Sequence, residues 1–266
     1  MNFTVNEQNK NVVMLSSQQE LDSRLRGRKL IGFADCYREQ CINPNMTQSL
    51  SFEERLGACL TRQDEYERNQ LYLRLIKNAG FRDNLSLDEI SKAPSKGLTL
   101  EILRELAGMS WIERGINIAV TGGCGVGKTA LACAAGRSVA RHGLSVLYMR
   151  TNDLLDHFKG IADHLAKGRA FKRIARFKVL ILDDFGIHGA FSNDDVQILL
   201  DIADQRYGLN PIILCSQYRM GGFYSLFPKS SGSESLLDRL LHPCLEIALD
   251  GDSRRGTLMQ GVETTE

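Results

Sequence analysis

A glycine-rich segment of eight residues has the clearest chemical signature in the sequence. Residues 122–129 read Gly-Gly-Cys-Gly-Val-Gly-Lys-Thr and fit the pattern G-x-x-x-x-G-K-[ST]. In such a loop, backbone N–H groups converge on a phosphate at the positive end of the following helix. The Lys128 charge would meet the β- and γ-phosphates, and the Thr129 hydroxyl would bind Mg²⁺. We therefore predict nucleotide contacts by Gly122, Gly123, Cys124, Gly125, Val126, Gly127, Lys128, Thr129 and Ala130.

A pair of acids is the second signature. Asp183 and Asp184 directly follow the apolar run 179–182. We expect this run to form a buried strand that returns beside the strand before the glycine-rich loop, so that Asp183 faces the same Mg²⁺ as Thr129. Two adjacent carboxylates at a strand end are costly unless a cation or solvent is near. The pair predicts nucleotide hydrolysis, in which Asp184 acts on the attacking water beside Lys128 and Asp183.

Two further polar positions leave alternatives open. Gln217 follows Ser216 at the end of an apolar run that we expect beside the strand of the glycine-rich loop. The polar side chain of Ser216 or Gln217 either reaches the γ-phosphate or the water, or both residues belong to a plain strand-to-loop junction. Arg239 lies in an otherwise apolar helical segment and needs a partner. That partner is either a neighbouring acid such as Asp238 or a phosphate on an adjacent subunit.

Positive charge gathers between residues 159 and 178. Seven lysines and arginines stand there against one acid, Asp163, which gives a net charge of +6 in a chain whose formal charge is +1. Cations spaced by three and four residues form a stripe along a helix, which suits a phosphate backbone regardless of base sequence. The alternative is an ordinary solvated helix face. We predict contacts with double-stranded DNA through Lys167, Arg169, Lys172, Arg173 and Arg176.

Composition narrows the class of protein. The chain has 266 residues, of which 43% are hydrophobic and 24% charged, so we expect one large or two modest globular domains. A formal charge of +1 excludes a globally basic nucleic-acid coat. Seven scattered cysteines without a Cys-x-x-Cys predict reduced intracellular thiols. Neither a signal peptide nor an apolar run of membrane-spanning length is evident, so we expect a cytoplasmic protein.

The elements before residue 110 are predicted to be helices, after a loose polar arm over 1–20. Helical spacing of apolar residues indicates a helix over 21–37 and another over 99–109. Capping boxes of the form Ser-x-x-Glu open two more helices, at Ser51 and at Ser86. The helix from Ser51 runs toward Gly80, and its apolar face is expected to comprise Phe52, Leu56, Cys59 and Leu60.

The elements beyond Gly115 alternate between short apolar runs and helical stretches. This alternation is typical of a parallel sheet covered by helices on both faces. We therefore predict a doubly wound α/β ATPase domain over 111–255, a helical region over 1–110 before it, and a polar tail over 256–266. The expected strands are 116–121, 145–149, 178–183, 211–216 and 244–249.

With these motifs the chain resembles the IstB-like transposition helper ATPases, which belong to the AAA+ group together with the DnaC helicase loaders and the DnaA initiators. The resemblance covers roughly residues 50–255. It implies an α/β fold with a P-loop AAA+ core and a parallel five-stranded sheet, preceded by an all-helical N-terminal region. The segments that carry it, besides the glycine-rich loop, are Leu50–Leu56, Trp111–Arg114, Leu182–Gly186, Ser216–Gln217, Leu237–Leu240 and Gly251–Arg255.

The resemblance implies a function as well. A protein of this kind uses ATP and Mg²⁺ to oligomerise on DNA, bends the DNA, presents it to a partner transposase and hydrolyses ATP at subunit interfaces. On this basis Ser216–Gln217 is the sensor-one position, Arg239 acts in trans as an arginine finger, and Arg255 is a better sensor-two candidate than Arg254. Two other functions stay open: a helicase loader similar to DnaC, and a non-catalytic clamp in which ATP only joins subunits on DNA.

Overall fold

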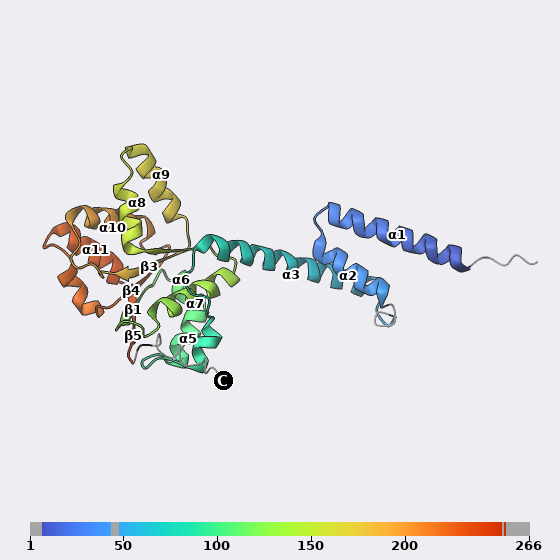
Figure 1. Ribbon diagram of the computed structural model, residues 1–266, viewed down its shortest axis with the longest axis horizontal. Coiled ribbons are helices and arrows are strands. Elements are labelled where there is room, and N and C mark those ends of the chain that lie inside the picture. Colours follow the sequence, from blue (N-terminus) through green and yellow to red (C-terminus); the bar gives the residue numbers. More distant parts are fainter. Residues whose placement is uncertain (1–6, 44–47, 252, 254–266) are drawn as a thin grey trace, which may run out of the picture. The chain divides into compact units, whose positions relative to one another are not determined.

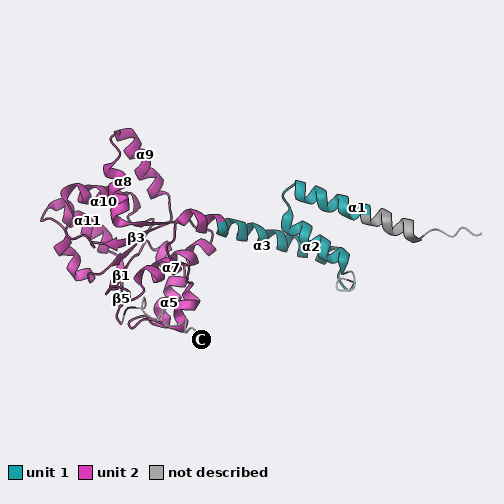
Figure 2. Cartoon of the chain, viewed as in Figure 1, with its two compact units in different colours: residues 1–73 teal, residues 74–266 magenta. Residues whose placement is uncertain are grey.

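The computed structural model describes residues 7–43, 48–251 and 253, and the chain divides into two compact units, residues 1–73 and 74–266 (Figure 2). The second unit contains one sheet of five parallel strands in the order β2-β3-β4-β1-β5. All five predicted strands are present. They are β1 (Asn117–Gly122), β2 (Val146–Arg150), β3 (Val179–Phe185), β4 (Ile212–Ser216) and β5 (Cys244–Leu249).

Helices cover both faces of this sheet (Figure 1). Alternate strand residues point to opposite faces, so Val179 and Ile181 belong to one core cluster and Leu180 and Leu182 to the other. The first cluster packs against α4 (Leu87–Lys92), α5 (Leu100–Ala107), α6 (Ser110–Glu113) and α7 (Lys128–Arg141). The second packs against α8 (Thr151–Lys159), α9 (His164–Ala175), α10 (Asn193–Arg206), the 3₁₀ helix η2 (Met220–Leu226) and α11 (Ser231–Leu241).

The order of the strands corrects one expectation. We predicted that the acidic strand would lie beside the strand of the glycine-rich loop, but β4 separates β3 from β1. β4 pairs with β1 through Val120 and Cys215 and with β3 through Ile181 and Ile213. Every residue of β1 and β4 is buried, and all but one of β3. The hydrophobic patterns of the three strands are therefore alike and do not indicate which strands lie side by side.

Three helices make up the unit of residues 1–73: α1 (Glu7–Gly27), α2 (Ile31–Ile42) and most of α3 (Phe52–Ala79). A helix thus replaces the predicted loose arm from residue 7 onward, because glutamine, glutamate and leucine in this stretch are good helix formers. The predicted helix over 21–37 is divided between α1 and α2 by a turn in which Lys29 has a left-handed backbone (φ 65°).

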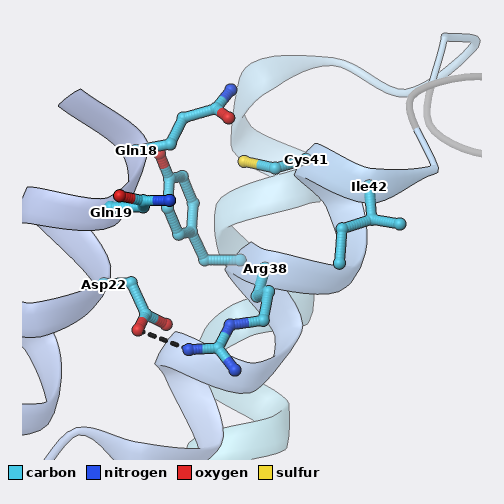
Figure 3. Close-up of a pocket in the computed structure, with 7 residues that line it drawn as sticks. Gln18, Gln19, Asp22, Arg38, Cys41 and Ile42 are labelled. Atoms are coloured by element: carbon cyan, nitrogen blue, oxygen red, sulfur yellow. Dashed lines mark hydrogen bonds and ion pairs between the residues drawn. The ribbon is translucent and has the colours of Figure 1, made fainter. Parts of the chain in front are cut away.

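Charged side chains join α1 to α2. Arg26 on α1 forms ion pairs with Asp22 and with Asp35 of α2, and Arg38 of α2 reaches back to Asp22 at 2.6 Å. These cations lower the pKa of the Asp22 carboxyl. Beside the Asp22–Arg38 pair, a cleft of about 310 Å³ opens between the two helices (Figure 3). It is lined by Gln18, Gln19, Asp22, Tyr37, Arg38, Cys41 and Ile42.

The contact between α2 and α3 is also largely polar. Gln40 and Arg55 exchange two hydrogen bonds, of 3.0 and 3.1 Å, across a small buried centre formed by Cys36 and Cys59. The capping boxes predicted at Ser51 and Ser86 are confirmed. The apolar face predicted for α3 is only partly correct, because Cys59 is buried but the other three side chains are exposed: Phe52, Leu56 and Leu60.

The compact units divide within α3, whereas we place the functional boundary at residue 110. Ala79 at the end of α3, together with α4, α5 and α6, packs into the same core cluster as the sheet. The limits 1–110, 111–255 and 256–266 remain predictions about function. Among the described helices, none is long and apolar enough to cross a membrane.

A buried arginine anchors the end of α9 to the sheet. Arg206, at the end of α10, is 1% exposed, and burial lowers its pKa to about 9, so it is charged at neutral pH. Its guanidinium donates to the carbonyl oxygens of Ile174, Phe177, Lys178 and Pro211 at 2.9–3.3 Å. The Ile174 carbonyl lies in the last turn of α9, and those of Lys178 and Pro211 directly precede β3 and β4. One side chain thus holds three segments together.

Replacing Arg206 with Met should lower the free energy of unfolding by about 3 kcal/mol or more, because four carbonyl oxygens would lose their charged donor. Urea denaturation measures this change. Arg173→Met, at an exposed position on α9, is the matched control and should change stability by less than about 0.5 kcal/mol. Equal effects of the two substitutions would mean that Arg206 does not anchor the fold.

Candidate nucleotide-binding site and basic helix

The glycine-rich loop joins the carboxyl end of β1 to the amino end of α7, as predicted. Gly125 and Gly127 have φ angles of 81° and 103°, a region that a residue with a Cβ adopts only with strain. α7 begins at Lys128, and its first turn contains Thr129 and Ala130. The loop is held from outside by Ser95, whose hydroxyl donates to the Val126 carbonyl at 2.7 Å. The backbone therefore forms the open turn that a phosphate group requires.

Lys128 lies folded over its own loop. Its ammonium donates to the carbonyl oxygens of Gly122 and Gly123 at 2.9 and 2.6 Å. Burial lowers the pKa of this ammonium, and nearby acidic groups, among them Asp183, oppose the shift. These carbonyl partners belong to the predicted phosphate-binding residues, so the ammonium of Lys128 already lies against that loop.

Asp183 and Thr129 meet at the carboxyl edge of the sheet. Asp183 is 1% exposed, and its Oδ2 accepts a hydrogen bond of 2.8 Å from the Thr129 hydroxyl. The same oxygen accepts a 2.6 Å bond from Tyr148 on β2, and the backbone carbonyl of Asp183 accepts from Thr151 at 2.9 Å. The two predicted metal ligands are thus brought together although β3 and β1 are not neighbours.

Asp184 occupies a different environment from Asp183. It lies where the pairing of β3 with β4 is irregular, and its backbone is left-handed (φ 56°). Its side chain is 36% exposed, and one oxygen lies 3.7 Å from Nε of Arg150 at the end of β2. One acid therefore faces the buried edge, and the other points toward solvent, where water can approach.

The residues at this edge suit ATP and Mg²⁺. Magnesium prefers oxygen ligands, and a hydroxyl and a carboxylate already lie within 2.8 Å of each other at Thr129 and Asp183. The glycine-rich turn and Lys128 add the backbone donors and the positive charge that phosphate groups need. Thr129 and Asp183 would therefore hold the metal, and the loop would hold the phosphates.

The end of β4 places Ser216 and Gln217 differently. Ser216 is buried, and its hydroxyl donates to the Phe185 carbonyl at 2.8 Å, which ties β4 to the end of β3. Gln217 is exposed at the same edge. The structure therefore gives Ser216 a structural contact, while a role of Gln217 toward the nucleotide remains a prediction.

Arg239 has a partner within its own chain. On α11, its Nε pairs with Asp204 of α10, and its Nη1 donates to the Ser235 carbonyl at 2.8 Å. The neighbouring acid that we considered as a partner, Asp238, lies instead 3.8 Å from His242. That interpretation is corrected because residues adjacent in a helix point in different directions.

The segment after β5 returns to the glycine-rich loop. A Cβ on Gly125 would lie 2.1 Å from Oγ of Ser253, so only a glycine allows this approach. Arg254 and Arg255, which we considered as nucleotide contacts, lie outside the described residues. The position of Ser253 shows only that the chain reaches the loop just before them.

The basic stretch forms a helix over only part of its length. α9 contains Lys167, Arg169, Lys172 and Arg173, and Arg176 caps its end. Of the five residues predicted to contact DNA, four are exposed and Lys167 is partly exposed. Phe171 stacks on buried Phe158 with ring centroids 4.2 Å apart, so the aromatic side chain of α9 faces the core.

The two lysines at the ends of the basic stretch form contacts with residues outside it. Lys159 pairs with Asp195 at 2.7 Å, and Lys178 donates to the Leu209 carbonyl at 2.7 Å. The charged stripe is therefore shorter than residues 159–178 suggested. Asp163 caps α9 and lies 3.7 Å from Arg169, so one acid remains near the amino end of the stripe.

Sequence reasoning missed three residues at the site: Ser95, Tyr148 and Thr151. Tyr148 could have been found only from the strand register, because it shares a sheet face with Ile181, two residues before Asp183. Ser95 and Thr151 act through hydrogen bonds to backbone carbonyls, for which the sequence offers no pattern.

Two relatives align with nearly the whole chain. A protein of Pseudomonas fluorescens, provisionally named the ATP-binding protein of insertion sequence IS1162, is 34% identical over 224 residues, which are 84% of this chain and 92% of the relative. A protein of Mycobacterium tuberculosis, provisionally named an ATP-binding protein in an insertion sequence, is 32% identical over 249 residues, which are 92% of this chain and 97% of the relative.

Two solved structures share the fold. The crystal structure of DnaI matches with a TM-score of 0.53 and 22% identity, over 66% of this chain and 92% of that protein. The replication initiator DnaA, solved with AMPPCP and single-stranded DNA, matches with a TM-score of 0.51 and 19% identity, over 70% and 58% of the two chains. The predicted α/β fold, with a parallel five-stranded sheet preceded by helices, is therefore confirmed.

The family described as "IstB-like ATP binding protein" matches residues 23–260. The match begins within α1, before the region over which we recognised the resemblance, and it includes the glycine-rich loop, the acidic strand end and α9. The chain therefore belongs to the IstB-like ATP-binding proteins.

Proposed function

We propose that this protein is an ATP-dependent transposition helper. It oligomerises on double-stranded DNA, remodels or bends the DNA, and delivers it as a target to a partner transposase. ATP is hydrolysed at the interfaces between subunits, and DNA stimulates this hydrolysis. The relatives named after insertion sequences support the biological setting of the proposal.

The observation that carries the ATPase part is the contact between Thr129 and Asp183. A hydroxyl at the start of α7 and a carboxylate at the end of β3 lie 2.8 Å apart, beside a loop built for phosphate. Mg²⁺ held there would neutralise charge on the phosphates during transfer. Asp184, partly exposed and next in the chain, orients or deprotonates the attacking water, and Gln217 at the neighbouring strand end assists it.

The DNA-binding part is supported by α9. Its cations are exposed, and Arg206 and Asn210 fix the carbonyls at its carboxyl end, so the charges are presented on an anchored helix. In an assembly, each subunit would contribute this helix to the phosphate backbone. A near-zero net charge lets the other faces of the subunits pack without mutual repulsion.

Replacing Lys128 with Ala should weaken ATP binding by about 100-fold and abolish ATP-dependent assembly on DNA, because the phosphates lose their charged donor. Binding of a fluorescent ATP analogue and sedimentation with duplex DNA measure the two effects. Lys92→Ala, an exposed lysine on α4, should leave both unchanged. Assembly of the Lys128 variant at the wild-type level would contradict the link between nucleotide and oligomer.

Replacing Lys172, Arg173 and Arg176 together with Ala should weaken binding to duplexes of every sequence alike. The slope of log affinity against log salt should fall by about 2 to 3, since each lost phosphate contact removes about 0.9. A variant with the same loss of charge on α3 provides the control: Arg68, Arg74 and Lys77 to Ala. If the two triple variants give the same slope, the cations of α9 do not bind the phosphate backbone and form an ordinary solvated helix face.

Replacing Arg239 with Ala should lower the rate of ATP hydrolysis by about 1,000-fold if the arginine completes the site of a neighbouring subunit. Asp184→Asn should abolish hydrolysis but not ATP binding. A 1:1 mixture of the two variants should then recover about a quarter of the wild-type rate, because some sites combine an intact Asp184 with an intact Arg239 from the next subunit. If the mixture recovers no activity, Arg239 does not act on the site of a neighbouring subunit, and its role is confined to the pair with Asp204.

The same preparations separate the alternative functions. A wild-type protein that assembles on DNA with ATP but releases no phosphate would be a non-catalytic clamp. Co-purification with a replicative helicase instead of a transposase would favour a helicase loader. Negative-stain imaging with ATP and duplex DNA gives the number of subunits in the assembly.

A further inference from the structure

The carboxylate of Asp183 has a hydrogen-bond donor that the ATPase motifs do not include. The hydroxyl of Tyr148, on β2, donates to Oδ2 at 2.6 Å, and Tyr148 is 9% exposed. This is the same oxygen that accepts from Thr129 at 2.8 Å. The other oxygen, Oδ1, accepts from the backbone N–H of Asp184 at 2.9 Å. Both carboxylate oxygens are therefore oriented by donors from three different segments.

Loss of the Tyr148 hydroxyl would leave this orientation incomplete. Oδ2 would keep only Thr129, whose own oxygen is the other predicted ligand of Mg²⁺. Asp183 would then be held by the Asp184 N–H on Oδ1 and by a hydroxyl on Oδ2 that the metal also needs. A metal site loses affinity when such outer partners are removed. Tyr148 is not a metal ligand itself, because its proton is directed at Asp183.

Tyr148 also lies next to the segment that connects α3 with the ATPase core, residues 80–84, here called the connector. Burial and the hydrogen bond to Asp183 raise the pKa of the Tyr148 phenol, whereas Arg82 of the connector faces that phenol and lowers it. The Gly80 backbone approaches the Tyr148 carbonyl, since a Cβ on Gly80 would lie 3.6 Å from its oxygen. The connector therefore lies beside Tyr148.

The connector is packed onto α7 as well, the helix that begins with Lys128 and Thr129. The Phe81 ring fills the space over Gly136, where a Cβ would lie 2.7 Å from a ring carbon. Arg137 donates to Asn84 at 2.8 Å. The connector packs against α7 and lies beside Tyr148 of β2. Movement of either element at the nucleotide site would therefore change the surroundings of residues 80–84.

We propose that Tyr148 is a positioning residue for the magnesium-holding carboxylate of Asp183, and that the connector, which packs against α7, is coupled to this carboxylate. The inference rests on the proposed ATPase site and adds a regulatory contact to it. Occupation of the site by Mg²⁺ and nucleotide is transmitted to the segment that leads to the helical unit.

Tyr148→Phe in the full chain tests the positioning role. Affinity for a fluorescent ADP analogue is measured in EDTA and during titration with Mg²⁺. We expect unchanged affinity in EDTA and a loss of about 10-fold in apparent Mg²⁺ affinity, as for other partners of metal-binding carboxylates. Tyr207→Phe, the same chemical change at an exposed position, should match the wild type.

Hydrogen exchange of the connector amides tests the coupling. In the wild type, Mg²⁺ and nucleotide together should slow exchange over residues 80–84. In Tyr148→Phe this change should be at least halved while exchange in β1 stays as in the wild type. A wild-type connector that does not respond to metal and nucleotide would overturn the coupling.

The outcomes separate this inference from the proposed function. If the wild type binds the nucleotide with Mg²⁺ and Tyr148→Phe behaves identically, the positioning role is wrong and the ATPase proposal stands. Equal weakening in EDTA and in Mg²⁺ would mean a general structural effect and would also overturn it. If the wild type shows no Mg²⁺-dependent binding, the proposed function itself fails.

Discussion

The hydrogen bond between Thr129 and Asp183 is the contact on which the rest of the nucleotide site depends. It joins the first turn of α7 to the end of β3 at 2.8 Å, although β4 separates β3 from the strand that precedes α7. Only a parallel sheet brings the carboxyl ends of these strands to one edge. The buried runs of β1, β3 and β4 and the helices on both faces therefore determine where this one contact forms.

Arg206 plays the corresponding part for α9. Repulsion among several cations on one helix destabilises that helix, and its last carbonyls need donors. Arg206 supplies donors to Ile174 and Phe177, and Asn210 supplies one to Ala175. The buried guanidinium adds positive charge near the carboxyl end of α9, where the helix dipole favours a cation. Anchoring at this end leaves the exposed charges of α9 in a fixed position.

Features that depend on a local pattern could be predicted from the sequence. The glycine-rich loop, both capping boxes and all five strands lie where spacing and residue type placed them, since each involves neighbours in the chain. Features that depend on distant neighbours could not be predicted. The pairing of β3 with β4 instead of β1, the pairing of Arg239 with Asp204, and the contact of Tyr148 with Asp183 each join segments separated by 30 residues or more. Lys159 and Lys178 likewise contact residues that are distant in the sequence, so their absence from the charged stripe could not be predicted.

The ion pair between Arg239 and Asp204 does not conflict with a role for Arg239 in a neighbouring subunit. The two side chains are 30% and 47% exposed, and pairs this accessible contribute about 0.2 to 1 kcal/mol. An arginine that stabilises the transition state of phosphoryl transfer contributes a factor of about 10³ to 10⁵ in rate, or about 4 to 7 kcal/mol. Releasing Arg239 from Asp204 therefore costs much less than the contact with the reacting phosphate would contribute. The pair would hold the guanidinium in one place until a neighbouring subunit brings its phosphates within reach.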